Sequence, residues 1–193
     1  MSTPMLIVIS GPSGCGKTSI AQAILQRHPE ILFSVSATTR PQRATEVNGK
    51  DYFFITREAF QQKIRDKELV EWEQIYDDFY GTPEEELRKA ATAGKPLLLD
   101  VDVKGALSIK NKYPAHSMLL FIKPPSMEVL KERLMNRRTE SPETLQKRMN
   151  RAAMEMEQAR RFDHTITNDI LKTAIDGADL IIVHLVSVPI KKV

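Results

Sequence analysis

Short apolar runs alternate along the chain with segments of helical periodicity. The runs are too uniformly apolar for strands with one solvated face, so they predict strands that are buried on both faces. Alternation of such strands with helices is typical of a parallel α/β sheet that is covered on both sides. We expect strands at residues 5–10, 32–36, 96–101, 117–122 and 165–167 and helices at residues 17–27, 103–111 and 127–136.

Residues 37–81 interrupt that alternation. β-rich runs at 51–55 and 69–75 flank a helical segment at 57–66. Aromatic and β-branched residues favour strands, so this stretch predicts a small sheet inserted into the larger fold.

Two helix starts are marked by capping residues. Thr82 is expected as an N-cap with Pro83 at the first helical position, and Gly94 marks the end of the same helix. Ser141 and Pro142 repeat the N-cap and the first-turn proline, which predicts a further helix joined closely to the one before it. We expect this helix pair to form a lid.

The length of 193 residues fits one domain with an insertion and a lid, and it leaves no room for two full domains. An apolar stripe of helical spacing between residues 171 and 185 predicts a C-terminal helix that covers the sheet. We expect one domain over residues 1–193, with a core of 1–36, 82–125 and 158–193, an insertion at 37–81 and a lid at 126–157.

Composition excludes several classes of protein. Hydrophobic residues make up 41% of the chain and charged residues 27%, which is ordinary for a globular protein. No apolar run approaches the roughly 18 residues that span a bilayer, and the N-terminus lacks a basic signal-peptide region. The one cysteine, Cys15, forms no intramolecular disulfide, so we expect a cytoplasmic protein. A net charge of +3 is too small to predict a nucleic-acid partner, and no membrane partner is expected.

A phosphate-binding loop follows the first expected strand. Residues 11–18 satisfy the pattern G-x-x-x-x-G-K-[ST] and lie between an expected strand and an expected helix. In that position their backbone N–H groups and the helix dipole would hold a polyphosphate. Lys17 would reach the β- and γ-phosphates of ATP, and the Thr18 hydroxyl would coordinate Mg²⁺. The expected ATP-binding residues are Gly11, Pro12, Ser13, Gly14, Cys15, Gly16, Lys17 and Thr18, with Cys15 as a small filler rather than a nucleophile.

This loop leaves open a GTPase, an ATPase motor, a helicase or a kinase of a small acceptor. A GTPase also needs a guanine-reading Asn-Lys-x-Asp stretch, and the segment at 111–114 reads Asn-Lys-Tyr-Pro. A small-acceptor kinase needs a second anionic pocket and a lid that bears arginines, which the two interruptions would supply.

Several ordered motifs resemble the guanylate kinase family. The match covers the chain from Leu6 to about Asn168, and the closing residues carry little of it. The motifs are Ser34-Val-Ser-Ala-Thr-Thr-Arg40-Pro-Gln-Arg43, Glu46-Val-Asn-Gly-Lys-Asp-Tyr52-Phe-Phe, Val70-Glu71-Trp72, Tyr80-Gly81-Thr82, Leu99-Asp100-Val-Asp102-Val-Lys-Gly105, Phe121-Ile-Lys-Pro-Pro-Ser126, Arg133-Leu134, Arg137 with Thr139-Glu140, and Lys147-Arg148. The resemblance implies a P-loop NTPase-type three-layer α/β fold with a parallel five-stranded core sheet, an inserted small mixed β-sheet that binds GMP, and a helical lid.

The residue types in these motifs suit an anionic purine acceptor. Arg40 and Arg43 with Tyr52 would hold a dianionic phosphate. Glu71 lies in an otherwise apolar strand, and a carboxylate there accepts hydrogen bonds from guanine N1–H and its amino group, which adenine cannot donate. Asp100 ends a strand where α/β sheets bind ligands, so it holds a Mg²⁺-bound water or pairs with a nearby helix terminus.

The resemblance assigns the remaining roles. Thr82 stands where many members have serine, and Arg138 where glycine is common, so either Arg137 or Arg138 would point inward. The implied GMP-binding residues are Ser36, Arg40, Arg43, Tyr52, Glu71, Tyr80, Thr82 and Asp102, and the implied catalytic residues are Lys17, Arg40, Arg133, Arg137 and Arg148.

The expected activity is transfer of the γ-phosphoryl group of MgATP to GMP and dGMP, which the resemblance places in purine nucleotide metabolism. Two alternatives stay open: a kinase of a phosphorylated sugar, and a silent binding module for phosphorylated peptides. No metal site is expected from the scattered histidines, His28, His116, His164 and His184.

Overall fold

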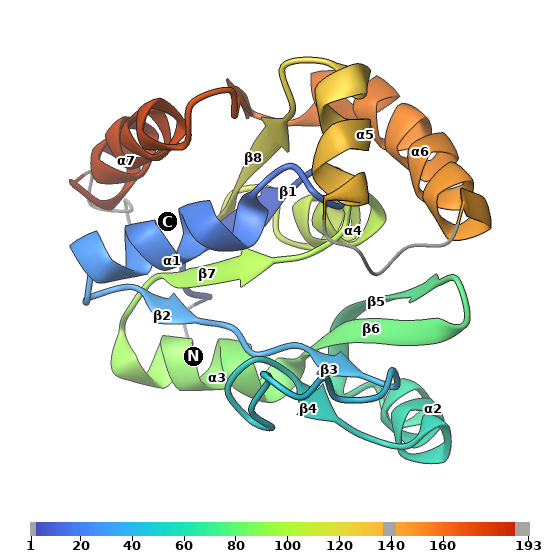
Figure 1. Ribbon diagram of the computed structural model, residues 1–193. Helices are drawn as coiled ribbons and strands as arrows, with labels where there is room; N and C mark the ends of the chain where they lie inside the picture. The colour runs from blue at the N-terminus through green and yellow to red at the C-terminus, as the bar shows by residue number, and fades with distance from the viewer. Residues whose placement is uncertain (1–2, 137–141, 188–193) are drawn as a thin grey trace.

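The computed structural model describes residues 3–136 and 142–187. Its central sheet has five strands in the order β2-β7-β1-β8-β9, and every neighbouring pair is parallel (Figure 1). This confirms the expected parallel α/β fold. The strands are β1 (Leu6–Ser10), β2 (Leu32–Phe33), β7 (Leu97–Asp100), β8 (Ser117–Lys123) and β9 (His164–Thr167).

Helices cover both faces of this sheet. Successive strand residues point to opposite faces, so Val8 and Ile9 of β1 belong to two separate apolar clusters. The cluster of Val8 also contains buried residues of α3 (Glu84–Ala93) and α4 (Val103–Lys112). The cluster of Ile9 contains buried residues of α1 (Lys17–Arg27) and α7 (Leu171–Ser187). Three layers result, with the inner strands β1, β7 and β8 almost entirely buried.

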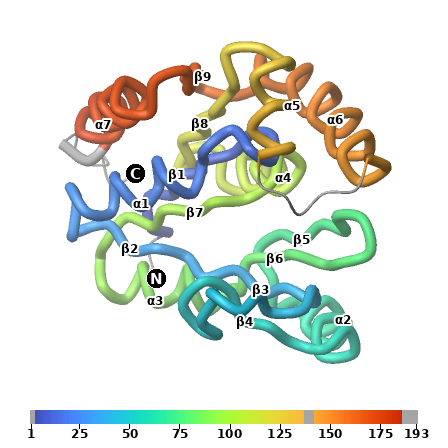
Figure 2. Tube along the Cα trace, in the orientation of Figure 1, coloured from blue at the N-terminus to red at the C-terminus, as the bar shows by residue number. Residues whose placement is uncertain are grey.

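A second, mixed sheet has four strands in the order β4-β3-β6-β5 (Figure 2). Its own helix, α2 (Arg57–Arg65), inserts the fully buried Phe60 into a small core with Ala37 and Leu69. The strands are β3 (Ala37–Thr38), β4 (Phe53–Phe54), β5 (Leu69–Ile75) and β6 (Asp78–Pro83).

The helices α5 (Met127–Met135) and α6 (Pro142–Glu157) form a separate pair. Leu130 and Leu134 of α5 pack against Ala152 of α6, and a short 3-10 helix (Ala159–Arg161) leads from α6 toward β9. Figure 1 shows α6 and the β5–β6 hairpin on the same side of the molecule, the side toward which the β7 arrow points. No helix in the described ranges is both long and apolar enough to cross a membrane.

The structure corrects two expected boundaries. Thr82 is not an N-cap, because β6 continues through Pro83, which itself precedes the first residue of α3, Glu84. The Thr82 hydroxyl instead donates to Glu71 on the neighbouring strand. The strand expected at 32–36 is shorter, since only Leu32 and Phe33 pair with β7. Gly94 ends α3 in the left-handed region, as expected. The helix start expected at Ser141 lies outside the described residues.

Candidate active site

The loop between β1 and α1 is shaped by glycines. Gly11 has a φ of 140°, and a Cβ atom there would lie 2.0 Å from the Ile122 carbonyl oxygen. Gly16 has a φ of 94°, and its Cβ atom would lie 2.2 Å from Asn168 Nδ2. That same Nδ2 donates to the Cys15 carbonyl at 2.8 Å, which fixes the loop to the end of β9. Larger residues are therefore excluded at both glycines by space as well as by backbone angle.

Lys17 begins α1 and folds back over this loop. Its Nζ donates to the carbonyl oxygens of Gly11 at 2.7 Å and Pro12 at 3.2 Å. Burial opposes the charge of the ammonium, but its neighbours Cys15, Asp100, Glu155 and Asp102 together outweigh burial and raise the Lys17 pKa above its ordinary value. The loop therefore carries a positive charge where a polyphosphate would lie.

Thr18 and Asp100 meet beside the loop. The Thr18 hydroxyl donates to Asp100 Oδ2 at 3.1 Å, across the gap between α1 and the end of β7. Burial raises the pKa of Asp100, and the Lys17 charge and the Thr18 hydrogen bond only partly offset this effect. A hydroxyl beside a carboxylate offers the hard oxygen donors that Mg²⁺ prefers. The described residues contain no group of three or more histidine, cysteine or acidic side chains that would hold a metal by itself.

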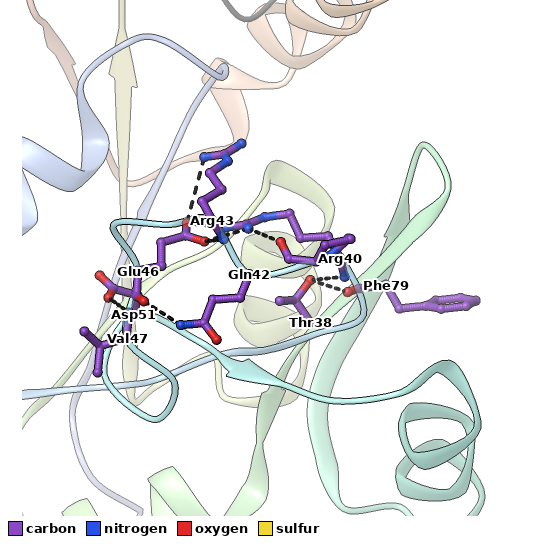
Figure 3. A network of polar contacts seen from close by, with 9 residues as sticks. Thr38, Arg40, Gln42, Arg43, Glu46, Val47, Asp51 and Phe79 are labelled. Atoms are coloured by element: carbon purple, nitrogen blue, oxygen red, sulfur yellow. Dashed lines mark hydrogen bonds and ion pairs between the residues drawn. The ribbon is translucent and has the colours of Figure 1, made fainter.

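Arg40 and Glu46 form a two-pronged ion pair on the small sheet (Figure 3). Arg40 donates from Nη1 at 2.8 Å and from Nη2 at 2.5 Å to the two oxygens of Glu46. The same carboxylate accepts from the Arg43 backbone N–H at 2.8 Å. The hydrogen bonds from Arg40 lower the Glu46 pKa to about 2, so Glu46 is ionised at neutral pH. The Arg43 guanidinium is 64% exposed and lies 3.9 Å from Glu46.

Two tyrosines adjoin this ion pair. The Arg40 guanidinium lies 5.1 Å from the centre of the Tyr52 ring, and the Tyr52 and Tyr80 rings meet edge to face at 6.1 Å. Burial raises the pKa of Tyr52 to about 12, so its phenol keeps its proton. The group therefore offers guanidinium and phenol donors to an anion.

Glu71 of β5 is buried, with only 8% of its surface exposed. Its Oε1 accepts from the Thr82 hydroxyl at 2.6 Å, and burial raises its pKa to about 7. A Cβ atom on Gly105 would lie 2.5 Å from Glu71 Oε2, so only glycine leaves room for the carboxylate. Asp102 lies nearby as the N-cap of α4, with its Oδ1 2.6 Å from the Gly105 nitrogen.

These groups line one cleft of about 350 Å³. Its lining includes most of the residues expected to bind ATP, GMP or metal: Gly11, Ser13, Gly14, Gly16, Lys17, Thr18, Ser36, Arg40, Arg43, Tyr52, Glu71, Tyr80, Asp100, Asp102 and Arg148. Pro12, Cys15, Thr82 and Arg133 do not line it. The Cys15 side chain is fully buried. The Thr82 hydroxyl donates a hydrogen bond to Glu71 and so supports that carboxylate.

The arginines expected in the lid have different partners in the structure. Arg148 of α6 lines the cleft and donates to the Ser13 hydroxyl at 3.3 Å. Arg133 of α5 donates instead to the Asn168 carbonyl at 2.9 Å and the Asp169 carbonyl at 3.3 Å. Arg137 and Arg138 lie outside the described residues. Arg133 therefore stabilises the chain that follows β9 and does not line the cleft.

The sequence interpretation missed five polar residues of the cleft. These are Ser19 at the start of α1, Glu73 and Tyr76 of the β5–β6 hairpin, and Arg151 and Glu155 of α6. Arg151 and Glu155 share a helix with Arg148, three and seven residues further on, so helical spacing from Arg148 could have found them.

Comparisons with known proteins agree with this geometry. The family model "Guanylate kinase" matches residues 3–184. The chain is 46% identical over 182 residues to the guanylate kinase of Chlorobium luteolum, covering 94% of this chain and 92% of the relative. It is 45% identical over 174 residues to that of Gloeobacter violaceus, covering 90% and 84%.

A solved structure supports the same assignment. The crystal structure of guanylate kinase from Anaplasma phagocytophilum matches 100% of this chain and 91% of its own length, with a TM-score of 0.82 and 29% sequence identity. Sequence and fold thus agree over nearly the whole chain, including the loop, the small sheet and the helix pair. The chain belongs to the guanylate kinase family.

Proposed function

We propose that the protein transfers the γ-phosphoryl group of ATP to GMP, and also to dGMP, giving ADP and the corresponding diphosphate. One observation carries the proposal. A phosphate-binding loop and a pocket with paired guanidinium and carboxylate groups line the same cleft, so two nucleotides would meet there. The product would feed purine nucleotide metabolism.

The donor side would hold ATP by its phosphates. Backbone N–H groups of residues 11–16 and the start of α1 would surround the β-phosphate. Lys17 Nζ would exchange the carbonyls of Gly11 and Pro12 for β- and γ-phosphate oxygens. Arg148, which already reaches Ser13, would add positive charge from the lid, as would Arg137 and Arg133 after the helices close.

The acceptor side would hold GMP by phosphate and base. Arg40, Arg43, Tyr52 and Tyr80 would donate to the phosphate, with Glu46 keeping the Arg40 fork in place. Above a pH of about 7 the ionised Glu71 would accept from guanine N1–H and the amino group. Ser36 and Asp102 would complete this pocket, and Thr82 would contribute by holding Glu71 in place.

Mg²⁺ fits the donor side. Thr18 would ligate it directly and Asp100 through water, since their oxygens lie 3.1 Å apart at the head of the loop. When bound, the ion would neutralise phosphate charge. The chain's own residues would supply the positioning: no covalent intermediate is required, because in-line placement and charge neutralisation suffice for phosphoryl transfer.

The chain would move as three parts. The core (1–36, 82–125 and 158–193) would hold ATP, the insertion (37–81) would carry GMP, and the lid (126–157) would close over both. Closure would exclude water, which otherwise competes for the phosphoryl group.

Release of ADP from ATP, measured with GMP, dGMP, AMP and ribose 1,5-bisphosphate as acceptors, tests the proposal. Rapid turnover is expected with GMP and dGMP only. Turnover with the sugar phosphate alone would instead identify a sugar-phosphate kinase. Absence of turnover together with absence of ATP binding in a calorimetric titration would indicate a binding module.

A further inference from the structure

Arg151 of α6 reaches across the cleft to the base side. Its Nη2 donates to Asp102 Oδ2 at 2.9 Å and its Nε to Glu155 Oε1 at 2.7 Å. The side chains of Arg151, Asp102 and Glu155 are only 21%, 10% and 12% exposed. An ion pair this sheltered constrains its members far more than a surface pair does.

The two oxygens of Asp102 are held by different elements. Oδ1 accepts from the Gly105 N–H of α4 itself, and Oδ2 accepts from Arg151 of α6. The hydrogen bond from the Gly105 N–H holds Oδ1 at the start of α4. The hydrogen bond from Arg151 holds Oδ2, so the two bonds together fix the orientation of the carboxylate plane. Each oxygen has a second lone pair, so Asp102 remains able to accept from a base.

The surroundings of Asp102 are rich in acidic groups. Glu71, Glu73 and Glu155 line the same cleft, and Lys104 already neutralises Glu73 at 2.7 Å. Arg151 supplies the compensating charge for Asp102 and Glu155. Without it, Asp102 would lie in a sheltered, acidic site and would have no ion-pair partner among the described residues.

Arg148 and Arg151 place one helix at both substrate sites. They are three residues apart on α6 and so project from the same side of the helix. Arg148 contacts Ser13 in the phosphate-binding loop, whereas Arg151 contacts Asp102 in the base pocket. Movement of α6 therefore cannot leave the base pocket unchanged.

We propose that Arg151 is a positioning residue for the acceptor base, which acts by orienting Asp102 and thereby links the lid helix to recognition of GMP. This inference rests on the proposed function, because Asp102 matters only if a base binds beside it.

Steady-state kinetics of Arg151→Met test the inference. We expect KM for GMP to rise about tenfold, because Asp102 is no longer oriented and loses its charge-assisted hydrogen bond to the base. KM for ATP should change less than about twofold. Arg151→Lys should restore most of the GMP affinity. Lys147→Met is the matched control, because it removes one charge from an exposed position of the same helix and should leave both constants unchanged.

A double-mutant cycle identifies the route through Asp102. In an Asp102→Asn background, Arg151→Met should raise KM for GMP less than about twofold further, because the group on which it acts is already altered. Fully multiplicative effects would overturn the inference.

Other outcomes separate this inference from the proposed function. Wild-type protein that phosphorylates GMP while Arg151→Met keeps the wild-type KM for GMP would overturn the inference alone. Equal increases in KM for both nucleotides, with a lower melting temperature, would show a merely structural ion pair. Wild-type protein that does not phosphorylate GMP would overturn both.

Discussion

The donor wall of the cleft consists mostly of backbone, whereas the acceptor wall consists of side chains. The donor wall comes mainly from one stretch of the chain, residues 11–18, of which all but Pro12 and Cys15 line the cleft, and its shape depends on glycines with positive φ. The acceptor wall gathers Arg40, Tyr52, Glu71 and Tyr80 from separate parts of the small sheet and its loops. A backbone site holds what all nucleotides share, their phosphates, and a side-chain site discriminates between bases.

The largest expected effect is on the donor wall. Lys17→Ala should lower kcat by about 1,000-fold, equivalent to about 4 kcal/mol, because the variant lacks the charge that meets the transferring phosphoryl group. A coupled assay of ADP release measures this. Circular dichroism should show an intact fold, and Lys131→Ala, at an exposed position of α5, should keep wild-type activity. Full turnover in the Lys17 variant would contradict the assigned role.

The glycines of the donor wall should be costly to replace. Gly11→Ala combines left-handed backbone strain with a clash against the Ile122 carbonyl, so the free energy of unfolding should fall by about 2–4 kcal/mol. Gly94→Ala is the matched control, because Gly94 also has a positive φ but no atom within 4 Å of its Cβ position. There we expect a loss of about 1 kcal/mol in urea denaturation. Equal losses would show that space does not matter at Gly11.

On the acceptor wall, Glu71→Gln should lower kcat/KM for GMP about tenfold at pH 8, since the charge-assisted bonds to guanine are weakened. In the wild type, kcat/KM for GMP should also fall as the pH drops below about 7, where Glu71 gains a proton. That acidic limb should vanish in the variant. Glu58→Gln, on the exposed side of α2, is the control. A pH profile that persists unchanged would assign the limb to another group.

Glu71 should also make stability depend on pH. Its folded pKa of about 7 lies above its ordinary 4.5, so the folded protein binds more protons between these values. The stabilising share of Glu71 is therefore complete below pH 4.5 and is lost as the pH rises through 7, by about 3 kcal/mol at most. Denaturation of wild type and Glu71→Gln at pH 5 and pH 8 measures the difference, and parallel curves would refute it.

The smallest effect is expected at Glu46. Glu46→Gln removes the carboxylate that holds Arg40, but Arg40 keeps its contacts with the Pro41 carbonyl and the Tyr52 ring. KM for GMP should rise only about threefold. An increase comparable to that of Arg40→Ala would show that Glu46 determines the position of the whole arginine pair.

The two walls also differ in how far the sequence predicts them. The phosphate-binding loop could be predicted because its geometry follows from a few adjacent residues between a strand and a helix. The prediction of a helix N-cap at Thr82 was wrong because a Thr-Pro pair can either start a helix or end a strand. Only the pairing of β6 with β5 decides between these two structures. The partner of Thr82, Glu71, lies eleven residues away.

Arg151 illustrates what local patterns cannot give. Ser141 and Pro142 predict the start of its helix but not which face of that helix meets the cleft, because the direction depends on how Ala152 packs against α5. The resemblance to guanylate kinases identified Arg148. Its neighbour Arg151 could be assigned to the base pocket only from the folded structure. The same limit applies to Arg133, which the sequence placed with Arg148 and the structure places against the chain after β9.

Calorimetric titration of ATP and of GMP into Lys17→Ala and Glu71→Gln tests the division between the two walls most directly. We expect a crossed result. Lys17→Ala should lose affinity for ATP and keep that for GMP, and Glu71→Gln should lose affinity for GMP and keep that for ATP. Equal weakening of both nucleotides by either variant would contradict it.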